Sequence, residues 1–280
     1  MTELTLASRL RTSQGLELPR LGFGVFQVAP GDVTRTAVAA ALRVGYRLID
    51  TAAMYGNEAD VGAAVRASGV PREEIVVTTK LWHTDHGYEA ALAAGRKSHE
   101  RLGLGPIDLY LIHWPRADSP QQRLDSWRAL ERLQRDGVVR TIGVSNYAVR
   151  HLEELAAVAE THPSVNQVEV HPFVYDPELI GYCHRRGIAV EAYSPLTRSR
   201  RLDDPRIAAV ARAKGRSPAQ VLLRWGLQHG LVELPRSVRE ERIRENAAVF
   251  DFALSPTEMT ALDGLSDGGR VTALDPVAIP

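Results

Sequence analysis

The feature that most constrains the fold of this chain is a regular alternation of short apolar runs with longer segments of helical periodicity. The apolar runs, which we predict to be strands, lie at residues 21–24, 46–49, 75–79, 107–112, 139–143, 165–170, 188–193 and 231–234. The segments that we predict to be helices lie at residues 33–44, 57–67, 88–102, 122–135, 151–159, 177–186, 205–214, 218–229, 240–246 and 256–262. Eight units of similar length favour an α/β fold with a closed parallel (β/α)8 barrel, the TIM barrel, over a doubly wound sheet.

A shorter segment precedes this alternation. Residues 5–19 alternate loosely around Thr12-Ser13-Gln14-Gly15, a sequence typical of a turn, and they end at Pro19. This pattern predicts an N-terminal β-hairpin ahead of the barrel. The chain has 280 residues, about the size of one such barrel, and no long linker or change of composition divides it. We therefore expect residues 1–280 to form a single domain.

The charge and cysteine content exclude several classes of partner. Lys plus Arg equals Asp plus Glu at 34 each, so no bulk charge indicates a nucleic acid or an anionic membrane. No apolar run reaches about 18 residues and the N-terminus lacks a long apolar region, so we expect neither a membrane span nor a signal peptide. The single cysteine, Cys183, forms no internal disulfide and fits a reducing, cytoplasmic location.

Polar side chains follow three successive predicted strands, where an apolar run would be expected to give way to an ordinary loop. The second, third and fourth strands are followed directly by Asp50, Lys80 and His113, and Tyr55 lies in the turn after Asp50. In a parallel barrel the C-terminal ends of all strands lie on one face, where the active sites of such enzymes are built. These four side chains should therefore converge on that face, although they are far apart in the sequence.

The sequence around these four residues resembles the aldo-keto reductase family. Residues 45–52 read Gly-Tyr-Arg-Leu-Ile-Asp-Thr-Ala, residues 55–58 Tyr-Gly-Asn-Glu, residues 79–82 Thr-Lys-Leu-Trp and residues 113–115 His-Trp-Pro. The resemblance implies that the N-terminal hairpin closes the bottom of the barrel and that the catalytic tetrad is Asp50, Tyr55, Lys80 and His113. The alternative interpretation is a buried Asp–Lys pair with a Tyr and a His packed nearby.

These four groups suit the reduction of a carbonyl compound. No side chain donates hydride, so a nicotinamide cofactor must supply it, while Tyr55 can supply the proton. A free phenol titrates near pH 10, and a neighbouring ammonium group, that of Lys80, would lower the pKa of Tyr55. Asp50 would hold Lys80 charged and in place, and His113 would donate a hydrogen bond to the substrate oxygen.

The cofactor cannot be held by a Rossmann phosphate site, because no Gly-x-Gly-x-x-Gly follows a predicted strand. Residues 143–147 read Gly-Val-Ser-Asn-Tyr and residues 193–196 read Tyr-Ser-Pro-Leu. Both segments resemble sequence motifs of the same family. The resemblance implies a set of residues around the nicotinamide: Ser145, Asn146 and Gln167 on the carboxamide, Tyr193 stacked on the ring, and Ser194 and Leu196 beside them. Taken alone, Ser-Asn could equally be a helix N-cap, and Gln167 a satisfied core amide.

A basic stretch at residues 234–246 completes the predicted cofactor site. The family's stretch at this position grips the 2′-phosphate of NADPH, which implies the phosphate contacts Arg236, Ser237, Val238 and Arg242 and the adenine contacts Glu245 and Asn246. Arg236 stands where the family usually has a lysine, and Thr197 stands where many members have a glycine. Without the resemblance, this stretch would be interpreted as a solvated helix face that is salt-bridged by its own glutamates.

Aromatic residues just past the strand ends predict the rim of a substrate pocket. The family places ligand-facing aromatics at Phe26, Trp82 and Trp114, beside His113, and such a rim suits carbonyl compounds with an apolar or sugar-like body. His83 and His86 are spaced as His-x-x-His, but no third ligand is evident, so we expect no metal site. The short C-terminal tail is similar to that of the short-tailed bacterial 2,5-diketogluconate reductase-like members.

The sequence therefore predicts an NADPH-dependent (NADP+-linked) oxidoreductase that reduces aldehydes or ketones, including keto-sugars or dicarbonyls, to alcohols. Its partners would be a small-molecule carbonyl substrate and the cofactor, and the family resemblance implies a monomer. Two alternatives remain open at this point. One is a nicotinamide-binding sensor or channel-associated subunit with little turnover, and the other is a barrel lyase or isomerase that binds a sugar phosphate at the Arg236 cluster.

Overall fold

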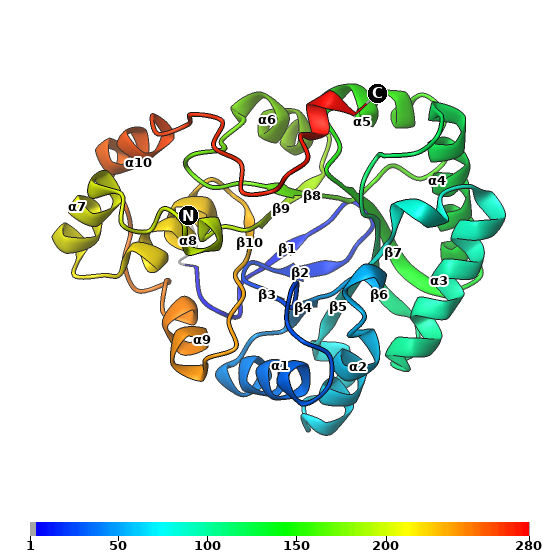
Figure 1. Ribbon diagram of the computed structural model, residues 1–280, viewed down its shortest axis with the longest axis horizontal. Helices are drawn as coiled ribbons and strands as arrows, with labels where there is room; N and C mark the ends of the chain where they lie inside the picture. The colour runs from blue at the N-terminus through cyan, green and yellow to red at the C-terminus, as the bar shows by residue number, and fades with distance from the viewer. Residues whose placement is uncertain (1–3, 280) are drawn as a thin grey trace.

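The predicted barrel is confirmed in a computed structural model of the protein, which describes residues 4–279. Eight parallel strands form one sheet in chain order, and Figure 1 shows the helices arranged around them. The strands are β3 (Phe23–Gly24), β4 (Leu48–Asp50), β5 (Val76–Leu81), β6 (Ile107–Ile112), β7 (Val139–Ser145), β8 (Val165–Glu169), β9 (Ala189–Tyr193) and β10 (Val232–Leu234).

The first and last strands approach each other and close the barrel. The backbone N–H of Gly22 donates to the carbonyl oxygen of Glu233 at 2.8 Å, and the N–H of Gly24 donates to that of Pro235 at 3.0 Å. Leu21 also pairs in parallel with Glu233. Because these contacts satisfy backbone groups that an open sheet edge would expose, the sheet has little free edge.

The helices cover the outside of the barrel. The α-helices are α1 (Asp32–Val44), α2 (Glu58–Ala67), α3 (Tyr88–Leu102), α4 (Pro120–Arg135), α5 (Val149–Ala156), α6 (Pro177–Arg185), α7 (Pro205–Lys214), α8 (Pro218–Gln228), α9 (Glu240–Ala247) and α10 (Pro256–Asp263). Short 3₁₀ turns are η1 (Ala53–Tyr55), η2 (Arg72–Glu74), η3 (His83–Asp85), η4 (Thr197–Ser199) and η5 (Pro276–Ala278). Of the described residues, none belongs to a helix long and apolar enough to cross a membrane.

Local sequence explains where many of these helices begin. Helices α4, α6, α7, α8 and α10 each start with a proline that follows a Ser or Asp whose side chain accepts a backbone N–H. Proline fits the first helical position because its missing N–H would have no partner there, and the preceding side chain caps another free N–H. Helix α5 differs from the predicted 151–159: it begins at Val149, and the ring of His151 accepts the N–H of Ala148 at 3.2 Å.

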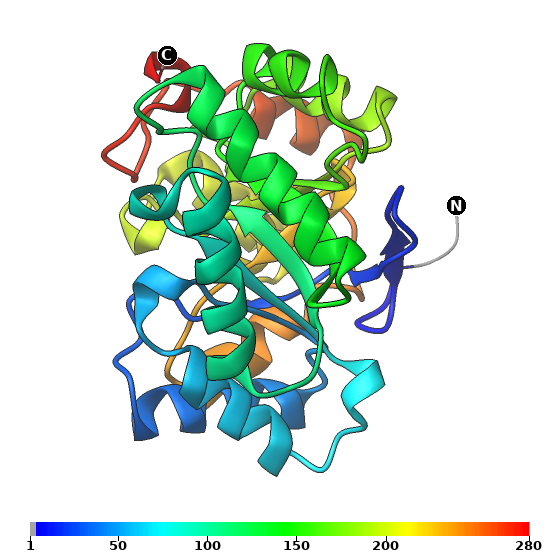
Figure 2. The same cartoon turned by 90° about the vertical axis from the view of Figure 1, so that its right-hand side faces the viewer.

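The N-terminal hairpin covers one end of the barrel, as Figure 2 shows where it stands to one side of the strands. It consists of β1 (Arg9–Arg11) and β2 (Glu17–Pro19) in antiparallel pairing. Leu18 lies in an apolar cluster inside the barrel with Leu48, Leu109 and others. The hairpin therefore closes the N-terminal end of the strands and leaves their C-terminal end open.

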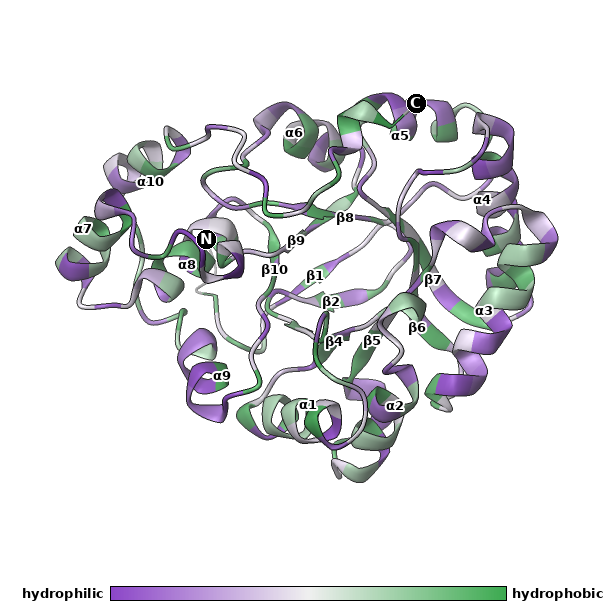
Figure 3. Ribbon diagram, viewed as in Figure 1, coloured by the Kyte–Doolittle hydropathy of each residue, from purple (hydrophilic) through white to green (hydrophobic). Residues whose placement is uncertain are grey.

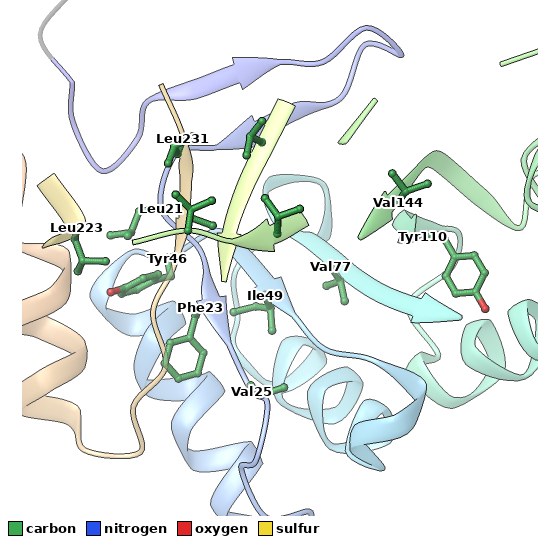
Figure 4. Close-up of a cluster of buried hydrophobic side chains, with 14 of the residues drawn as sticks. Leu21, Phe23, Val25, Tyr46, Ile49, Val77, Tyr110, Val144, Leu223 and Leu231 are labelled. Carbon is green, nitrogen blue, oxygen red and sulfur yellow. The ribbon is translucent and has the colours of Figure 1, made fainter. Parts of the chain in front are cut away.

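The larger apolar core lies between the strands and the helices. All six residues of β5 and all six of β6 are buried, which is typical of parallel strands covered on both faces. Figure 4 shows side chains of this core, among them Phe23, Ile49 and Val77. In Figure 3, hydrophobic colour concentrates on the strands, whereas helices such as α3 and α9 also carry hydrophilic stretches. Burying one such side chain contributes about 1.5–3 kcal/mol.

Two strands extend further toward the open end than predicted. The predicted strand 46–49 is β4, which ends at Asp50, and the predicted strand 75–79 is β5, which continues through Lys80 to Leu81. Both polar residues are therefore fixed by the backbone pairing of the sheet rather than by a loop. Asp50 is 4% exposed and Lys80 is 0% exposed, so each needs a charged or polar partner inside the barrel.

Candidate active site

A cleft of about 650 Å³ lies at the C-terminal ends of the barrel strands. Most of the residues predicted for the site line it. From the tetrad these are Asp50, Tyr55 and His113; from the predicted substrate rim, Phe26, Trp82 and Trp114; and from the predicted cofactor set, Asn146, Gln167, Tyr193, Ser194, Leu196, Arg236, Ser237, Val238, Arg242, Glu245 and Asn246. Lys80 and Ser145 are fully buried and do not line the cleft.

Lys80 lies directly beneath the cleft floor in contact with Asp50. Its Nζ donates to both carboxylate oxygens of Asp50 at 2.7 Å and to the carbonyl oxygen of Thr51 at 2.8 Å. All three donor hydrogens of the ammonium group are thereby used. This ion pair agrees with the predicted role of Asp50, which is to hold Lys80 in place.

Tyr55 lies above this pair, on turn η1. The Nζ of Lys80 is 5.2 Å from the centre of the Tyr55 ring, and the Phe26 ring lies 5.0 Å from it, centre to centre. Burial, followed by the carboxylate of Asp50, raises the pKa of Tyr55 well above its ordinary value, against a lowering by Arg198. We expected Lys80 to lower this pKa, and the direction is the opposite. The physical reason is burial, which disfavours the charged phenolate, and the carboxylate of Asp50 adds to the rise.

His113 follows the end of β6 and faces Tyr55 and Trp82 edge-on. The ring centres are 5.8 Å apart for Tyr55 and 5.1 Å apart for Trp82. Burial and the charge of Lys80 hold the pKa of His113 well below its ordinary value, so the imidazole is neutral near pH 7. Its Nδ1 has no hydrogen-bond partner among residues 4–279. A neutral imidazole carries one N–H donor and can therefore offer a hydrogen bond without adding a charge.

Asn146 connects three elements at the edge of the cleft. Its Nδ2 donates to the carbonyl oxygen of His113 at 2.9 Å, and the hydroxyl of Tyr193 donates to its Oδ1 at 2.8 Å. Its φ of 63° is in the left-handed region, which asparagine tolerates better than most residues. The hydroxyl of Ser145 instead donates to the main-chain carbonyl oxygen of Gln167 at 2.7 Å. The predicted residue Ser145 thus lies behind the cleft wall, beside Asn146.

Gln167 joins Asp50 to a second buried carboxylate that had no predicted role. Its Nε2 donates to Asp50 Oδ2 at 2.8 Å and to Glu191 Oε2 at 2.6 Å. Both amide hydrogens are used in this way, which leaves the side-chain carbonyl oxygen of Gln167 as its acceptor on the cleft wall. Burial, together with the charge of Asp50, raises the pKa of Glu191 to about 8. In the sequence, the feature that indicates this network is the presence of two polar residues, Gln167 and Glu191, within otherwise apolar strands.

The basic stretch lies after β10 and on helix α9. Two of its arginines, Arg239 and Arg244, lie close to glutamates of the helix, and two others do not. Arg244 pairs with Glu240 at 2.6 Å, and Arg239 lies 3.5 Å from a carboxylate oxygen of Glu241. Arg236 and Arg242 are exposed on the cleft and make no ion pair within residues 4–279. The alternative of a self-paired helix face thus fits only part of the stretch, and two guanidinium groups stay available to an anion.

The cleft is lined by further residues that the sequence did not predict. Met54 and Leu274 line it and are 45% and 38% exposed, and the tail residues Thr272 and Ala273 also contribute. Arg198, on turn η4, is the fourth arginine of the wall besides Arg236, Arg239 and Arg242. No pattern in the sequence places the tail or the η4 turn against the cleft, because both are irregular segments.

The two histidines of the His-x-x-His pair contact different partners. His83 stacks on Trp82 with ring centres 4.3 Å apart, whereas His86 is held by Ser126 at 2.8 Å and by the carbonyl oxygen of Trp114 at 3.0 Å. No group of three or more His, Cys, Asp or Glu that could hold a metal ion is found among residues 4–279.

A parallel barrel with a cleft at the C-terminal ends of its strands defines the class of (β/α)8-barrel enzymes. Within that class, the sequence model of the Aldo/keto reductase family matches residues 20–267, and the chain belongs to this family. The protein is therefore an oxidoreductase that acts on carbonyl compounds.

The relatives extend over nearly the whole chain. A glyoxal reductase of Bacillus subtilis is 49% identical over 267 residues, which cover 95% of this chain and 96% of the relative. A morphine 6-dehydrogenase of Pseudomonas putida is 46% identical, with 94% of this chain and 92% of the relative covered. The crystal structure of a Bombyx mori aldo-keto reductase in complex with NADP has a TM-score of 0.89 and 34% identity, covering 97% of this chain and 96% of that one.

Proposed function

We propose that this protein reduces aldehydes and ketones to alcohols with NADPH. The observation that supports this function is that Tyr55 and His113 line the same cleft as the unpaired Arg236 and Arg242. One cleft thus offers a proton donor, a hydrogen-bond donor for a carbonyl oxygen, and cations suited to a phosphate.

Tyr55 is proposed to donate the proton. Its raised pKa keeps the phenol protonated across the neutral range, which suits donation to the oxygen of a carbonyl as that oxygen gains negative charge. His113, neutral for the reasons given above, donates a hydrogen bond to the same oxygen and orients it. Asp50 and Lys80 act beneath Tyr55, where their ion pair fixes the electrostatic surroundings of the phenol.

The cleft wall fits a nicotinamide dinucleotide. Asn146 and the side-chain carbonyl oxygen of Gln167 are proposed to hold the carboxamide, with Ser145 supporting Asn146 from behind. Tyr193, fixed through its hydroxyl, is proposed to stack on the ring, with Ser194 and Leu196 beside it. When bound, the nicotinamide supplies the hydride that no side chain can.

The preference for NADPH over NADH is proposed to rest on the arginines. A 2′-phosphate carries roughly two negative charges near neutral pH, and guanidinium groups bind phosphate oxygens in a fork-like geometry. Arg236 and Arg242 line the cleft and make no ion pair in the described chain, and Ser237 and the backbone of Val238 lie between them in sequence. Glu245 and Asn246 lie on the same cleft wall and are proposed to contact the adenine. The NADP in the Bombyx mori relative supports this preference.

The substrate is proposed to be a small carbonyl compound with an apolar part. Phe26, Trp82 and Trp114 line the cleft, with Met54 and Leu274 beside them, and such a wall favours ligands with an apolar body. The names of the relatives, a glyoxal reductase and a morphine 6-dehydrogenase, refer to substrates of very different size, so they support the reaction rather than a particular substrate.

The test is a screen of NADPH oxidation with aldehydes, ketones, keto-sugars and dicarbonyls, run with wild type and Tyr55→Phe. We expect turnover of several aldehydes by wild type and almost none by the variant. Tight NADPH binding without any turnover would instead favour the sensor function, and absence of NADPH binding by fluorescence titration would reject the proposal.

A further inference from the structure

Glu191 is a buried carboxyl group that the proposed reaction does not use. It lies on β9 and is 0% exposed. Its Oε2 accepts a hydrogen bond from Nε2 of Gln167 at 2.6 Å, whereas its Oε1 has no hydrogen-bond partner among residues 4–279. Buried polar atoms are nearly always paired in stable proteins, so an unpaired carboxyl oxygen beneath a ligand cleft indicates a role in function.

Glu191 has no counter-ion in the part of the chain that the structure describes. Asp50 shares Nε2 of Gln167 with it, at 2.8 Å. Lys80 directs its three hydrogens to Asp50 and to the carbonyl oxygen of Thr51, so none remains for a second carboxylate. The charge of Lys80 is thus balanced by Asp50, and an ionised Glu191 would leave one negative charge in excess inside the barrel.

The carboxyl groups on the two strands beside β9 are engaged by other partners. Glu233 on β10 packs against helix α8, and Arg20 is the cation that acts on it. Glu169 on β8 accepts hydrogen bonds from the tail residue Thr272. Neither strand therefore supplies Glu191 with a charge that would compensate its ionisation.

Asp50 and Lys80 are the charges that act on Glu191. Burial and the carboxylate of Asp50 raise the pKa of Glu191 to about 8, against a smaller lowering by Gln167 and Lys80. Near pH 7 the carboxyl group is therefore mostly protonated and neutral. A positive charge placed in the cleft above it would favour loss of that proton.

Glu191 is separated from the cleft by one side chain. Gln167 lines the cleft and is proposed to hold the carboxamide of the nicotinamide. Tyr193, the proposed partner of the ring, follows Glu191 by two residues on β9, so both side chains lie on the same face of the strand. The oxidised nicotinamide ring carries a positive charge and the reduced ring does not. A carboxyl group beneath these two residues can therefore distinguish the two rings by charge.

We propose that Glu191 releases its proton to solvent when the oxidised cofactor occupies the cleft and takes a proton back when the reduced cofactor replaces it. This inference rests on the proposed reductase function. The carboxylate then supplies the counter-ion that the positive ring lacks elsewhere in the barrel. Only a proton moves in this step: no bond to the cofactor forms, and no electrons are transferred. Glu191 acts through its charge and is not a catalytic residue.

The proposal makes the affinity for NADP+ depend on pH more strongly than the affinity for NADPH. Below the pKa of Glu191 in the free enzyme, binding of NADP+ must expel a proton, so its dissociation constant should fall as pH rises. Binding of NADPH expels none. The 2′-phosphate titrates near pH 6, but both cofactors carry it, and its effect cancels in the ratio of the two dissociation constants.

The test measures this ratio and counts protons. Both dissociation constants are determined by fluorescence titration between about pH 6 and about pH 9. Proton release at pH 7 is determined by calorimetry in buffers of different ionisation enthalpy. The proteins are wild type, Glu191→Gln, Tyr55→Phe, and Glu233→Gln as the matched control, because Glu233 is also buried but packs against helix α8.

In wild type we expect the ratio of the NADP+ to the NADPH dissociation constant to fall at least about fivefold over this range. Wild type should also release at least about 0.3 more protons with NADP+ than with NADPH. Both effects should persist in Tyr55→Phe and Glu233→Gln. In Glu191→Gln the ratio should change less than about twofold, and the difference in proton release should vanish.

Three results would overturn the inference while leaving the reductase function intact. A constant ratio with equal proton release in wild type would show that Glu191 does not respond to the cofactor, and this measurement needs no variant to fold. Effects that are lost in Tyr55→Phe would assign the proton to the phenol. Effects that persist in folded Glu191→Gln would assign it to another group. Absence of binding of both cofactors to wild type would reject the proposed function itself.

Discussion

Lys80 on β5 donates from Nζ to both carboxylate oxygens of Asp50 on β4, at 2.7 Å each. Both side chains are buried, so each is the principal charge partner of the other. The pair contributes, through the carboxylate of Asp50, to the raised pKa of Tyr55, of which burial is the largest cause. It also makes the two residues energetically dependent on each other.

Lys80→Met should therefore lower stability as well as activity. Removing one partner of a buried ion pair leaves an uncompensated charge, at a cost of about 3–5 kcal/mol. We expect the free energy of unfolding in urea to fall by that order in Lys80→Met, and the double variant Asp50→Asn, Lys80→Met to recover much of the loss. If the double variant lost as much unfolding free energy as the two single variants together, this coupling would be contradicted. The unpaired Asp50 should also shift the remaining pH profile of Lys80→Met upward.

Tyr55→Phe should remove most carbonyl reduction and leave NADPH binding unchanged. The variant loses only the phenolic hydroxyl, and the loss of a positioned proton donor costs about 10²–10⁴-fold. Because the pKa of Tyr55 lies well above 10, wild-type reduction should show no titration of this group between about pH 6 and about pH 9. The measurements are single-turnover rates across pH and NADPH fluorescence titration. A variant with half the wild-type rate would show that the proton comes from another group.

Glu191→Gln should change the pH dependence of stability. In the unfolded chain the carboxyl of Glu191 ionises near pH 4.3, whereas in the folded protein its pKa is about 8. Between these values the folded state binds more protons, so stability falls as pH rises, by about 1.4 kcal/mol per pH unit. Glutamine mimics the neutral acid and should remove this slope. The check is to measure the free energy of unfolding in urea over this pH range for wild type, Glu191→Gln and the surface control Glu178→Gln. Parallel pH curves for wild type and Glu191→Gln would contradict the prediction.

Arg242→Ala should weaken NADPH binding at least about tenfold, since a charge-assisted hydrogen bond contributes about 1.5–3 kcal/mol. NADH lacks the 2′-phosphate and should be affected less than about twofold. Arg244→Ala is the matched control, because Arg244 lies on the same helix but pairs with Glu240. Both dissociation constants are measured by fluorescence at low and high salt, where screening should reduce the difference. Equal weakening of both cofactors would assign Arg242 to the helix or the adenine instead.

Glu169→Ala should release the C-terminal tail from the cleft. The Oε1 of Glu169 accepts the N–H of Val271 at 2.6 Å, and its Oε2 accepts the N–H and the hydroxyl of Thr272. Burial alone would raise the pKa of Glu169, but hydrogen bonds from His171, Thr272 and Val271 lower it, so the carboxylate is charged.

Without these contacts the tail should open more often. We expect trypsin to cleave after Arg270 at least about tenfold faster in Glu169→Ala, and KM for carbonyl substrates to rise while the NADPH dissociation constant stays constant. Glu160→Ala, at an exposed surface ion pair, should behave as wild type. Unchanged cleavage and KM would show that the tail is held by its other contacts, such as that of His151 with Ile279.

The sequence by itself determined the order and kind of the elements. Apolar runs and helical periodicity are local patterns, and the capping residues before α4 and α8 are local too, so the barrel could be predicted without any contact being known. The same holds for Asp50, Lys80 and His113. A parallel barrel brings all strand ends to one face, so their positions at strand ends were enough to predict that they meet.

Only the tertiary structure decided which groups beyond those strand ends act together. Glu169 meets the tail more than 100 residues later, Gln167 bridges Asp50 and Glu191, and Arg198 reaches the cleft from a strained turn. None of these contacts follows from periodicity, because irregular segments take their path from side chains that are distant in the chain. The pKa of Tyr55 was likewise decided by burial and by the charge balance of its neighbours, quantities that exist only once the chain is folded.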